Sequence, residues 1–565
     1  MHYHQNSGVG LSIGQRLIDE FLATRSLNSH LILIPTTRSV AKSADSIRVL
    51  RAHLHHTAET SAPLRSRYGY GHGPGSETSS DTSPDHHEYD PQKVIDRVHL
   101  LSAELDLCDL GSVYRVADRL VHGTIADPTG VTAAGAELDL PRLDAIVLNA
   151  GIGGWAGISW SRVLPQFLSV GLIQSVTYPA FKALLPRAVL DTREMLRKAK
   201  VAAGIENEED GGEKGDDDDD EEKQVLSDYS PEDPPELAEV FCANLFGHYI
   251  LAHELMPLLA RPINDGNNSP IPPGRVVWVS SIDAGEEHLD MDDFQARVSA
   301  PPYESSKRIT DLITLSADLP SIRPLTRSYF STSFVKMSSP LYATADLSAS
   351  THSISASTTT STSTSPESAT PTPTSSVASG STSVGVVTTT GAPARPPRFC
   401  LSHPGVVCTP LFPLNWFLYF WYTMVVHLSR LLGSPWHVTW PYLAACAPAW
   451  LALTASDDEL RTRAPAKWGS ACDRRGTVAA PKRTEVEGWG WRGRVGETVE
   501  DSDNDDGDDG SLSFLSKSCG RKWDATILTA DRRARFEQDA RRCWVELERL
   551  RAAWELALGR RSEED

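Results

Sequence analysis

The stretch Asp-Ala-Ile-Val-Leu-Asn-Ala-Gly, residues 144–151, decides the fold. A short, mostly apolar run ends in a turn that contains Asn149 and Gly151, which is the pattern of a buried strand followed by a loop. The other runs of this kind lie at residues 30–34, 98–105, 275–279 and 398–402. Continuous Val, Ile and Leu runs favour strands that are buried on both faces of a sheet.

Helical patterns lie between these strands. The helical candidates are residues 10–22, 110–121, 236–259 and 303–315. Strands that alternate with helices predict an α/β fold, a doubly wound parallel sheet of the Rossmann type that forms a single domain. A last helix near residues 531–558 carries one apolar stripe, which predicts packing against the domain. That stripe consists of Phe536, Cys543, Leu547, Leu550 and Trp554.

Four insertions interrupt this domain, and their composition predicts disorder because they have little apolar surface to bury. They are residues 53–92 (rich in His, Gly, Ser and Pro), 206–235 (acidic), 321–397 (rich in Ser and Thr) and 496–511 (acidic). The structured parts are then residues 1–52, 93–205, 236–320, 398–495 and the C-terminal helix within 512–565.

Charge and cysteine content exclude several classes of protein. The net charge is −20, but residues 206–223 hold 12 acidic and 2 basic residues, and residues 497–509 hold 8 acidic and none basic. The rest of the chain is nearly neutral, which disfavours nucleic-acid binding. The eight cysteines form no C-x-x-C motif, which argues against a zinc site and a disulfide framework and favours a reducing, cytosol-facing compartment. We predict no metal site.

Two short motifs predict a dinucleotide site. Gly8 and Gly10 lead into the amphipathic stretch that starts at Leu11, and glycines at such a turn let the backbone approach a pyrophosphate at a helix N-terminus. After the second strand come Thr37 and Arg38. An acidic residue there suits the ribose of NAD, whereas an arginine accommodates the 2′-phosphate of NADPH. An ordinary glycine turn and a solvated arginine are the alternatives.

A tyrosine and a lysine, Tyr303 and Lys307, lie four positions apart on one helical candidate. Residues at i and i+4 share a helix face. We expect the ammonium, together with a nicotinamide ring, to lower the pKa of the phenol, which suits proton transfer to a carbonyl during hydride delivery.

With Asn244, the pair Ser280-Ser281 and the Asn149-Ala150-Gly151 turn in the same order, these residues resemble the short-chain dehydrogenase/reductase family. The resemblance implies a catalytic set in which Ser281 orients the substrate carbonyl, Tyr303 donates a proton, Lys307 binds ribose and Asn244 holds a water. Ser280 is hardly distinguishable from Ser281 at this point. The positions that the resemblance assigns to the cofactor are Gly8, Gly10, Leu11, Thr37, Arg38, Asp109, Asn149, Gly151, Tyr303, Lys307, Pro404, Gly405, Val407 and Thr409.

The chain departs from the family pattern in two places. Ser281 and Tyr303 are 22 positions apart, so an extra loop lies between them. The strand and the Thr-Gly that open the family pattern are missing before Asn6. That strand is central, and its side chains would contribute roughly 5–10 kcal/mol, which is comparable with the stability of a whole domain, about 5–15 kcal/mol. We therefore expect that Met1 is a mispredicted start and that an upstream exon encodes the strand.

An uncharged block follows the last strand. Residues 399–429 contain no Asp, Glu, Lys or Arg, and their densest part, residues 414–426, is shorter than the roughly 20 residues that span a bilayer. It favours a lid for a large apolar substrate or a helix at a membrane surface. A core segment and a dimer helix remain as alternatives.

Further segments resemble the fungal branch of the family that reduces 3-keto sterols during C4-demethylation. They lie at residues 8–22, 34–39, 303–308, 430–437 and 467–470. The resemblance implies NADPH-dependent reduction to a 3β-hydroxysterol in ergosterol biosynthesis. It also implies peripheral association of residues 406–456 with the cytosolic face of the endoplasmic reticulum or of lipid droplets, alongside other C4-demethylation enzymes. A non-catalytic scaffold and a reductase of another lipid ketone are the competing interpretations.

Overall fold

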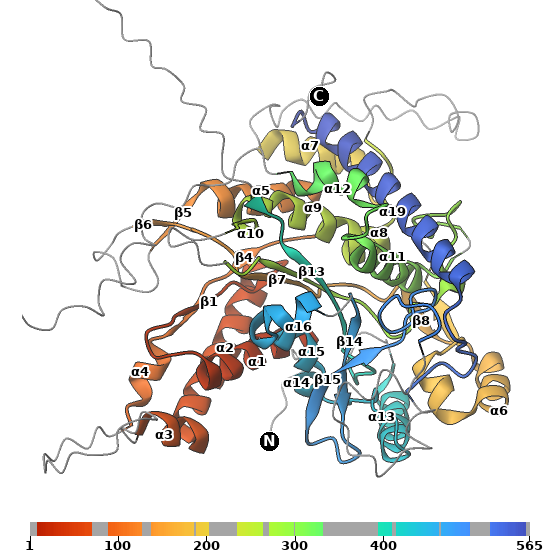
Figure 1. Cartoon of the computed structure of the whole chain (residues 1–565), viewed down its shortest axis with the longest axis horizontal. Coiled ribbons are helices and arrows are strands. Elements are labelled where there is room, and N and C mark those ends of the chain that lie inside the picture. The colour runs from red at the N-terminus through yellow and green to blue at the C-terminus, as the bar shows by residue number, and fades with distance from the viewer. Residues whose placement is uncertain are drawn as a thin grey trace, which may run out of the picture.

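The computed structural model describes residues 8–69, 89–126, 137–185, 188–202, 234–263, 271–298, 300–331, 394–409, 414–462, 465–497 and 520–560. Within them the chain is an α/β protein whose main sheet is mostly parallel (Figure 1).

The strands are β1 (Leu31–Leu33), β2 (Thr36–Thr37), β3 (Val98–Leu100), β4 (Ala103–Glu104), β5 (Thr124–Ala126), β6 (Glu137–Asp139), β7 (Ala145–Leu148), β8 (Trp155–Ile158), β9 (Lys182–Leu184), β10 (Arg261–Pro262), β11 (Arg275–Val279), β12 (Ala394–Arg395), β13 (Arg398–His403), β14 (Lys467–Cys472) and β15 (Ala479–Thr484).

The helices up to residue 260 are α1 (Val9–Thr24), α2 (Val40–Thr60), α3 (Ala62–Gly69), α4 (Pro91–Ile95), α5 (Leu110–His122), α6 (Trp160–Thr177), α7 (Thr192–Ala202), α8 (Glu239–Phe241), α9 (Gly247–Glu254) and α10 (Met256–Leu259). The later helices are α11 (Pro302–Ser316), α12 (Arg323–Phe330), α13 (Trp416–Leu431), α14 (Pro441–Ala444), α15 (Cys446–Ala449), α16 (Asp457–Thr462) and α19 (Ala530–Ala557).

Five strands form the main sheet in the order β15-β14-β13-β11-β7. β7, β11, β13 and β14 are parallel, and β15 pairs antiparallel with β14. In β11, Val276, Val277, Trp278 and Val279 are all buried, because helices cover both faces of this central strand. The expected continuous apolar strand is thus confirmed here.

Two layers of helices enclose the sheet (Figure 1). Helices α1, α14 and α15 lie on one face, whereas α5, α9 and α11 lie on the other. The C-terminal helix α19 runs along the outside of α11, and the predicted apolar stripe of α19 is buried. The expected packing role of this last helix is therefore confirmed.

The strands β1 and β3 form a separate parallel pair, continued by the pair β2 and β4. Among the described residues no hydrogen-bonded strand joins β1 to β7. Helix α1 connects the two parts by packing, since Ile13 and Leu17 contact a cluster that includes both Leu33 and Val147. Residues 1–7 lie outside the described residues, so the missing first strand and the upstream exon stay predictions.

The expected boundaries of two insertions are corrected. The first insertion, residues 53–92, contains the end of α2, all of α3 and the start of α4. Leu54, Ala58 and Leu64 are buried there, so this segment does bury apolar surface despite its polar composition. In the third insertion, residues 321–397, α12 buries Tyr329. The acidic residues 206–233 and the Ser/Thr-rich residues 332–393 lie outside the described residues.

Candidate functional site

The carboxyl ends of three parallel strands bring the predicted site residues together. Trp278 of β11 pairs with Leu148 of β7, and Val279 pairs with Ser402 of β13. The residues that follow these strands, Asn149 and the serine pair 280/281 among them, therefore emerge at one edge of the sheet. This edge is where ligands bind in open α/β sheets.

Tyr303 and Lys307 lie side by side on the first turns of α11, as their spacing predicts. The Lys307 Nζ lies 5.7 Å from the centroid of the Tyr303 ring. The same ammonium donates a hydrogen bond to the Val279 carbonyl at 2.8 Å. The pair is thus fixed to the end of β11, next to the two serines.

The two serines face different ways. The Ser281 hydroxyl is hydrogen-bonded to the Tyr303 phenol and also accepts the Asp283 N–H at 3.2 Å. The Ser280 hydroxyl instead donates to Asp311 at 2.5 Å and to the Lys307 carbonyl at 3.2 Å, and its side chain is buried. The geometry favours Ser281 as the residue that faces a substrate.

The electrostatics of Tyr303 differ from the expectation. Burial raises the pKa of the phenol to about 12, and the lysine that opposes this rise most strongly is Lys182 on β9, with the Ser281 hydrogen bond next. Burial also lowers the pKa of Lys307 to about 8. The expected lowering of the tyrosine pKa by Lys307 is therefore wrong for the protein alone, because desolvation outweighs it.

Asn244 lies in a π-helical turn, Cys242–Phe246, between α8 and α9. Its Oδ1 accepts the Ile152 N–H at 2.7 Å, and its Nδ2 donates to the Ile152 carbonyl at 3.0 Å and to Ser306 Oγ at 3.2 Å. Such π-turns are frequent at functional sites. Asn244 therefore links the loop after β7 to Ser306 on α11, which lies three positions after Tyr303.

The glycine motif begins α1. Gly8 is the N-cap residue of α1, and no side chain caps the helix there. A Cβ placed on Gly8 would meet nothing within 4 Å. A Cβ on Gly10 would lie 3.0 Å from Asn149 Nδ2, so the helix approaches the end of β7 closely. Leu11 packs against the cluster of β1 and α2. Among the described residues nothing lies against Gly8 at the first turn of α1, which leaves space for a phosphate.

The residues expected to bind adenosine lie near β2 and α5. Thr37 Oγ1 is hydrogen-bonded to Ser39 and Ser43, whereas Arg38 is exposed and pairs with none of the residues that the structure describes. Asp109 is the N-cap of α5. Its Oδ2 pairs with Arg115 at 3.3 Å, and its Oδ1 is buried without a hydrogen-bond partner. A buried, unsatisfied acceptor fits a donor such as the adenine amino group.

The segment after β13 makes a sharp turn at Gly405. Gly405 has φ +75°, and a Cβ there would lie 2.5 Å from the Trp436 carbonyl, so only glycine fits. Val407 forms a bridge with Thr439. Pro404 and Thr409 lie on either side of this bridged segment. The segment is thus anchored to residues 436–439.

Sequence reasoning missed several buried charged residues at this site. Lys467 on β14 donates to Asp311 at 2.6 Å and to the Ser281 carbonyl at 2.5 Å. Lys182 pairs with Asp283 at 2.6 Å and with Glu304. These partners lie more than 100 positions apart in sequence, so no short motif indicates them.

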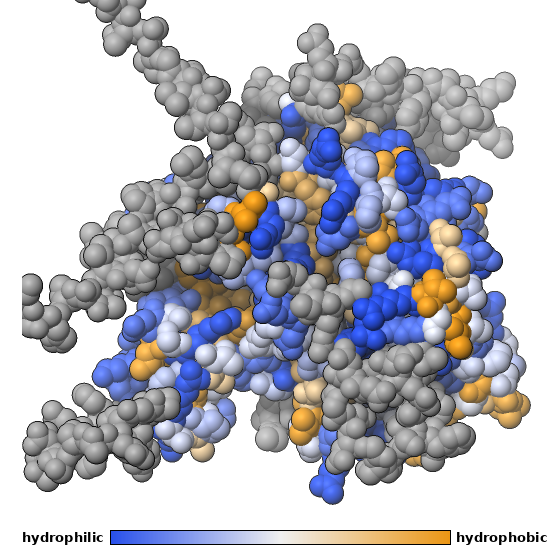
Figure 2. Space-filling view, in the orientation of Figure 1, coloured by the Kyte–Doolittle hydropathy of each residue, from blue (hydrophilic) through white to orange (hydrophobic). Residues whose placement is uncertain are grey.

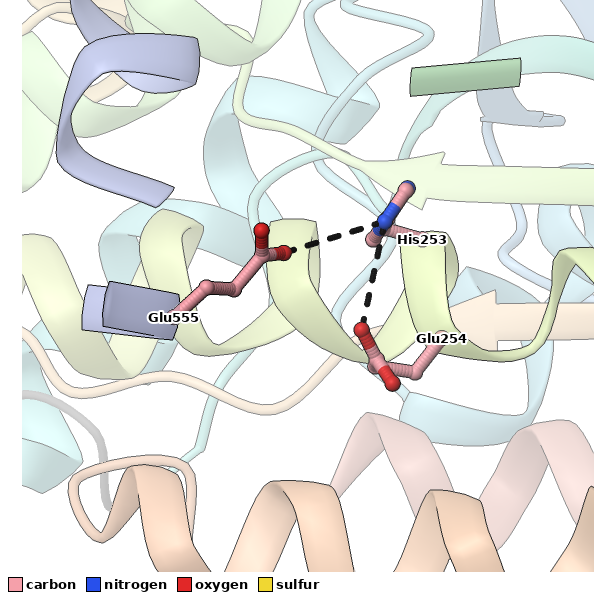
Figure 3. Close-up of side chains that lie close together, drawn as sticks. All are labelled: His253, Glu254 and Glu555. Carbon is pink, nitrogen blue, oxygen red and sulfur yellow. Dashed lines mark ion pairs between the residues drawn. The ribbon is translucent and has the colours of Figure 1, made fainter. Parts of the chain in front are cut away.

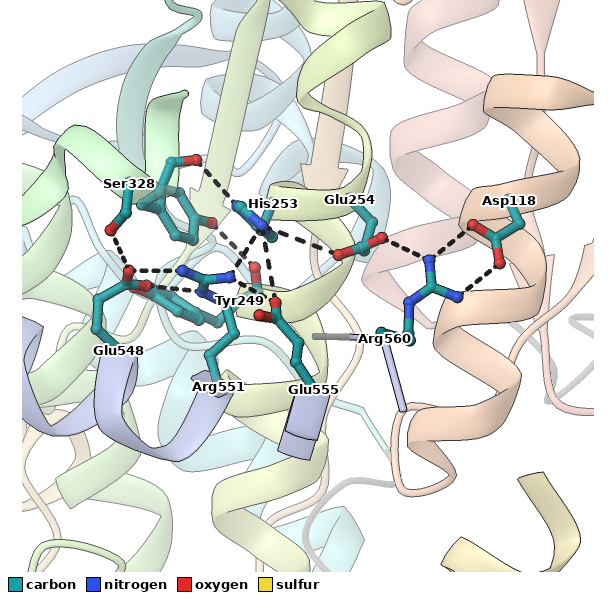
Figure 4. Close-up of polar contacts among 10 residues, drawn as sticks. Asp118, Tyr249, His253, Glu254, Ser328, Glu548, Arg551, Glu555 and Arg560 are labelled. Carbon is teal, nitrogen blue, oxygen red and sulfur yellow. Dashed lines mark hydrogen bonds and ion pairs between the residues drawn. The ribbon is translucent and has the colours of Figure 1, made fainter. Parts of the chain in front are cut away.

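A second polar cluster lies away from this edge (Figure 3). Oxygens of Glu254 and Glu555 each lie 3.9 Å from His253 Nε2. Arg551 approaches the same nitrogen at 3.1 Å and also pairs with Glu555. A guanidinium in this position disfavours a metal ion. Figure 4 shows that the cluster joins α19 to α9 and α12, and that Arg560, which follows α19, pairs with Asp118 on α5. We therefore interpret the cluster as a structural connection.

The apolar block forms an exposed helical face. In α13 the exposed apolar residues are Trp416, Phe417, Phe420, Trp421, Met424, Leu428 and Leu431. Helix α13 contacts α6, on which Trp160, Leu164 and Leu168 are also exposed. Figure 2 shows hydrophobic residues at the α6 edge of the molecule. The alternative of a core segment is excluded for this outward face. Among the described helices, none is both long and apolar enough to cross a bilayer.

Comparisons with known proteins give similar chains over almost the full length. The chain is 38% identical to the 3-keto-steroid reductase ERG27 of Gibberella zeae, over 98% of this chain and 93% of that protein. It is 32% identical to the 3-keto-steroid reductase erg27 of Aspergillus fumigatus, over 97% and 92%. A segment of 80 residues is 40% identical to human 3-keto-steroid reductase/17-beta-hydroxysteroid dehydrogenase 7, over 14% of this chain and 21% of that one. No protein-family model matches the chain.

Proposed function

We propose a function from one premise: the chain belongs to the 3-keto-steroid reductase family, as its identity to two fungal members over more than nine-tenths of its length shows. The protein is a reductase that converts a 3-keto sterol to the 3β-hydroxysterol during the C4-demethylation steps of ergosterol biosynthesis. The observation that carries the reaction type is the hydrogen-bonded Ser281–Tyr303 pair beside Lys307.

The cofactor is NADPH, bound in a Rossmann-type arrangement along the carboxyl edge of the sheet. Three features support this assignment: the open first turn of α1 for a pyrophosphate, the unsatisfied Asp109 Oδ1 for adenine and the exposed Arg38 for a 2′-phosphate. When bound, NADPH supplies the hydride. Lys307 and Tyr303 would hold its ribose, and the segment 404–409 would close over its nicotinamide.

The residues of this chain control the proton and the position of the ketone. Tyr303 gives its phenolic proton to the carbonyl oxygen, and Ser281 donates a hydrogen bond to the same oxygen. A phenol whose pKa is about 12 is fully protonated at neutral pH, so it enters the reaction as the acid. Asn244 keeps α11 aligned with the loop after β7 through Ser306.

The protein works at the cytosolic face of a sterol-containing membrane, endoplasmic reticulum or lipid droplet, together with other C4-demethylation enzymes. The exposed faces of α6 and α13 support this proposal, because their aromatic residues suit the lipid interface. Residues 399–429 carry no charge, and Arg162 is the only charged residue between Asp144 and Lys182. The Tyr419 hydroxyl on α13 donates to the Cys408 carbonyl at 3.0 Å, so the lipid-facing helix adjoins the expected nicotinamide segment.

The test uses the purified full chain with a 3-keto sterol in detergent micelles, following NADPH consumption and the 3β-alcohol product. The wild-type protein is expected to reduce the ketone, and Tyr303→Phe to lose activity by about 10²- to 10⁴-fold with unchanged melting. Tryptophan quenching should show that the variant still binds NADPH. An equal rate in wild type and Tyr303→Phe would refute the mechanism, and NADPH binding without turnover of any ketone would favour a scaffold.

A further inference from the structure

Lys182 is a buried lysine that no motif indicates. It begins β9, which pairs antiparallel with β8, and α6 connects the two strands. Its side chain is only 11% exposed, and lysine is almost never buried without a charged partner. The surroundings of its ammonium therefore need an explanation.

The Lys182 ammonium connects two segments of the catalytic site. It donates to Asp283 Oδ2 at 2.6 Å and to the Glu304 carboxylate. Asp283 lies two residues after Ser281, and Glu304 is the residue next to Tyr303. One cation thus holds the serine loop against the start of α11.

The same ammonium also fixes an aromatic ring beside the tyrosine. Its Nζ lies 4.9 Å from the centroid of the Trp155 ring, within the range of a cation–π contact. The Trp155 ring in turn lies 4.7 Å from the Tyr303 ring at an interplanar angle of 60°. The β8–β9 pair therefore places both a cation and an indole against Tyr303.

Lys182 keeps its positive charge to a higher pH than Lys307 does. Burial opposes the charge on Lys182, but Asp283 and Glu304 outweigh burial and raise its pKa above the ordinary value. Burial and the nearby Lys467 instead lower the pKa of Lys307 to about 8. Above pH 8, where Lys307 loses its proton, Lys182 is the more permanent positive charge near the phenol.

We propose that Lys182 is a positioning residue of the reductase, which fixes Tyr303 and Trp155 and supplies a permanent positive charge beside the phenol. It transfers no proton itself. The inference rests on the proposed function, since it assigns Tyr303 the role of proton donor. The other charged groups around the site are Asp283, Glu304, Lys307, Asp311, Lys467 and His288, which lies 3.4 Å from Asp283.

The first test compares Lys182→Met with Lys182→Arg in the full chain. The pH profile of kcat is measured for NADP-dependent oxidation of the 3β-alcohol, the direction in which the phenol must lose its proton. A nearby cation favours phenolate, so its removal raises the pKa of Tyr303. Lys182→Met should therefore move the rising limb of this profile to higher pH by about one unit and lower kcat about tenfold. Lys182→Arg should restore the wild-type limb. An unmoved limb in Lys182→Met would overturn the proposal.

A second variant keeps the test decisive if Lys182→Met does not fold. Glu304→Gln retains the lysine and removes a carboxylate that raises the pKa of Tyr303. It should therefore move the same limb to lower pH, in the opposite direction. A limb that stayed in place in Glu304→Gln would show that the charges paired with Lys182 do not act on the phenol, and that result would exclude an electrostatic role.

Failure of the inference can be told apart from failure of the proposed function. The wild-type rate with a 3-keto sterol tests the function alone. If the wild type reduces no ketone, NMR of isotope-labelled tyrosine rings, with Tyr303→Phe for assignment, still measures the phenol titration without turnover. If Tyr303 titrates at the same pH in the wild type and in Lys182→Met, the inference is overturned, whether or not the wild type reduces a ketone.

Discussion

Gly151 and Asn244 lie so close together that a Cβ on Gly151 would stand 2.6 Å from Asn244 Oδ1. The same oxygen accepts the N–H of the next residue, Ile152. The absence of a side chain at position 151 therefore lets Asn244 reach the loop after β7, and through Ser306 the contact extends to the turn of α11 that carries Tyr303.

Gly151→Ala should displace Asn244 and reduce catalysis more than stability. We expect a loss of kcat of at least about tenfold and a decrease of about 1–3 kcal/mol in the free energy of unfolding. Steady-state kinetics and urea denaturation measure the two effects. Gly8→Ala is the control for stability, because a Cβ there meets nothing within 4 Å. Full activity in Gly151→Ala would show that the position of Asn244 is unimportant.

Exchanging the two neighbouring serines separates their roles. Ser281→Ala removes the hydroxyl that is bonded to Tyr303 and should lower kcat about 10²-fold with little change in melting temperature. Ser280→Ala leaves buried Asp311 with one partner fewer and should cost about 1–3 kcal/mol of stability. Its kcat should stay close to that of the wild type. The reverse pattern would assign catalysis to Ser280.

Arg38→Ala tests the choice of cofactor. The guanidinium is exposed beside the end of β2, and a charge-assisted contact to a phosphate contributes about 1.5–3 kcal/mol. The variant should bind NADPH about 10- to 100-fold more weakly, with NADH affinity almost unchanged. Tryptophan quenching titrations with both nucleotides measure this. Equal losses for the two would remove the basis for assigning NADPH.

Lys307→Met should abolish reduction while making the protein more stable. The native pKa of Lys307, about 8 against the ordinary 10.5, shows that burial penalises its charge. Since the unfolded chain binds this proton more tightly, the penalty is complete below pH 8 and disappears as pH rises through 10.5. After allowing for the lost bond to Val279, we expect a gain of about 2 kcal/mol at pH 7. Calorimetry at pH 7 and pH 10 should show this gain shrinking.

Replacing Phe417, Phe420 and Trp421 by serine tests whether the exposed apolar face of α13 binds lipid. These side chains are 52%, 54% and 52% exposed, and burying each in a bilayer would contribute about 1.5–3 kcal/mol. Flotation with phosphatidylcholine–ergosterol vesicles should capture the wild type and at least about tenfold less of the triple variant. Val545→Ser on α19, where the valine is 49% exposed, should float like the wild type. Equal flotation of all three proteins would exclude this surface as the membrane-binding site.

Much of the site could be predicted because its residues lie in local patterns. The i, i+4 spacing of Tyr303 and Lys307, the turn at Asn149 and the apolar strands each depend on contacts within one element, and the structure places them as expected. The preference for Ser281 over Ser280 needed the geometry, since both follow the same strand. Lys182 and Lys467 could not be found, because their partners come from distant segments. The raised pKa of Tyr303 was missed because sequence alone does not give burial.

The position of α19 along α11 has a genetic consequence. Trp544 donates to Ser316 at the end of α11, and Arg308, one residue after Lys307, stacks on Phe536 at 5.2 Å. A late nonsense or frameshift allele that removed the residues after position 530 would keep the codons of all the proposed catalytic residues. It would nevertheless expose the side of α11 that α19 covers, and α11 carries Tyr303 and Lys307. Such an allele should behave as a null, and a strain that carries a premature stop there should lack reductase activity.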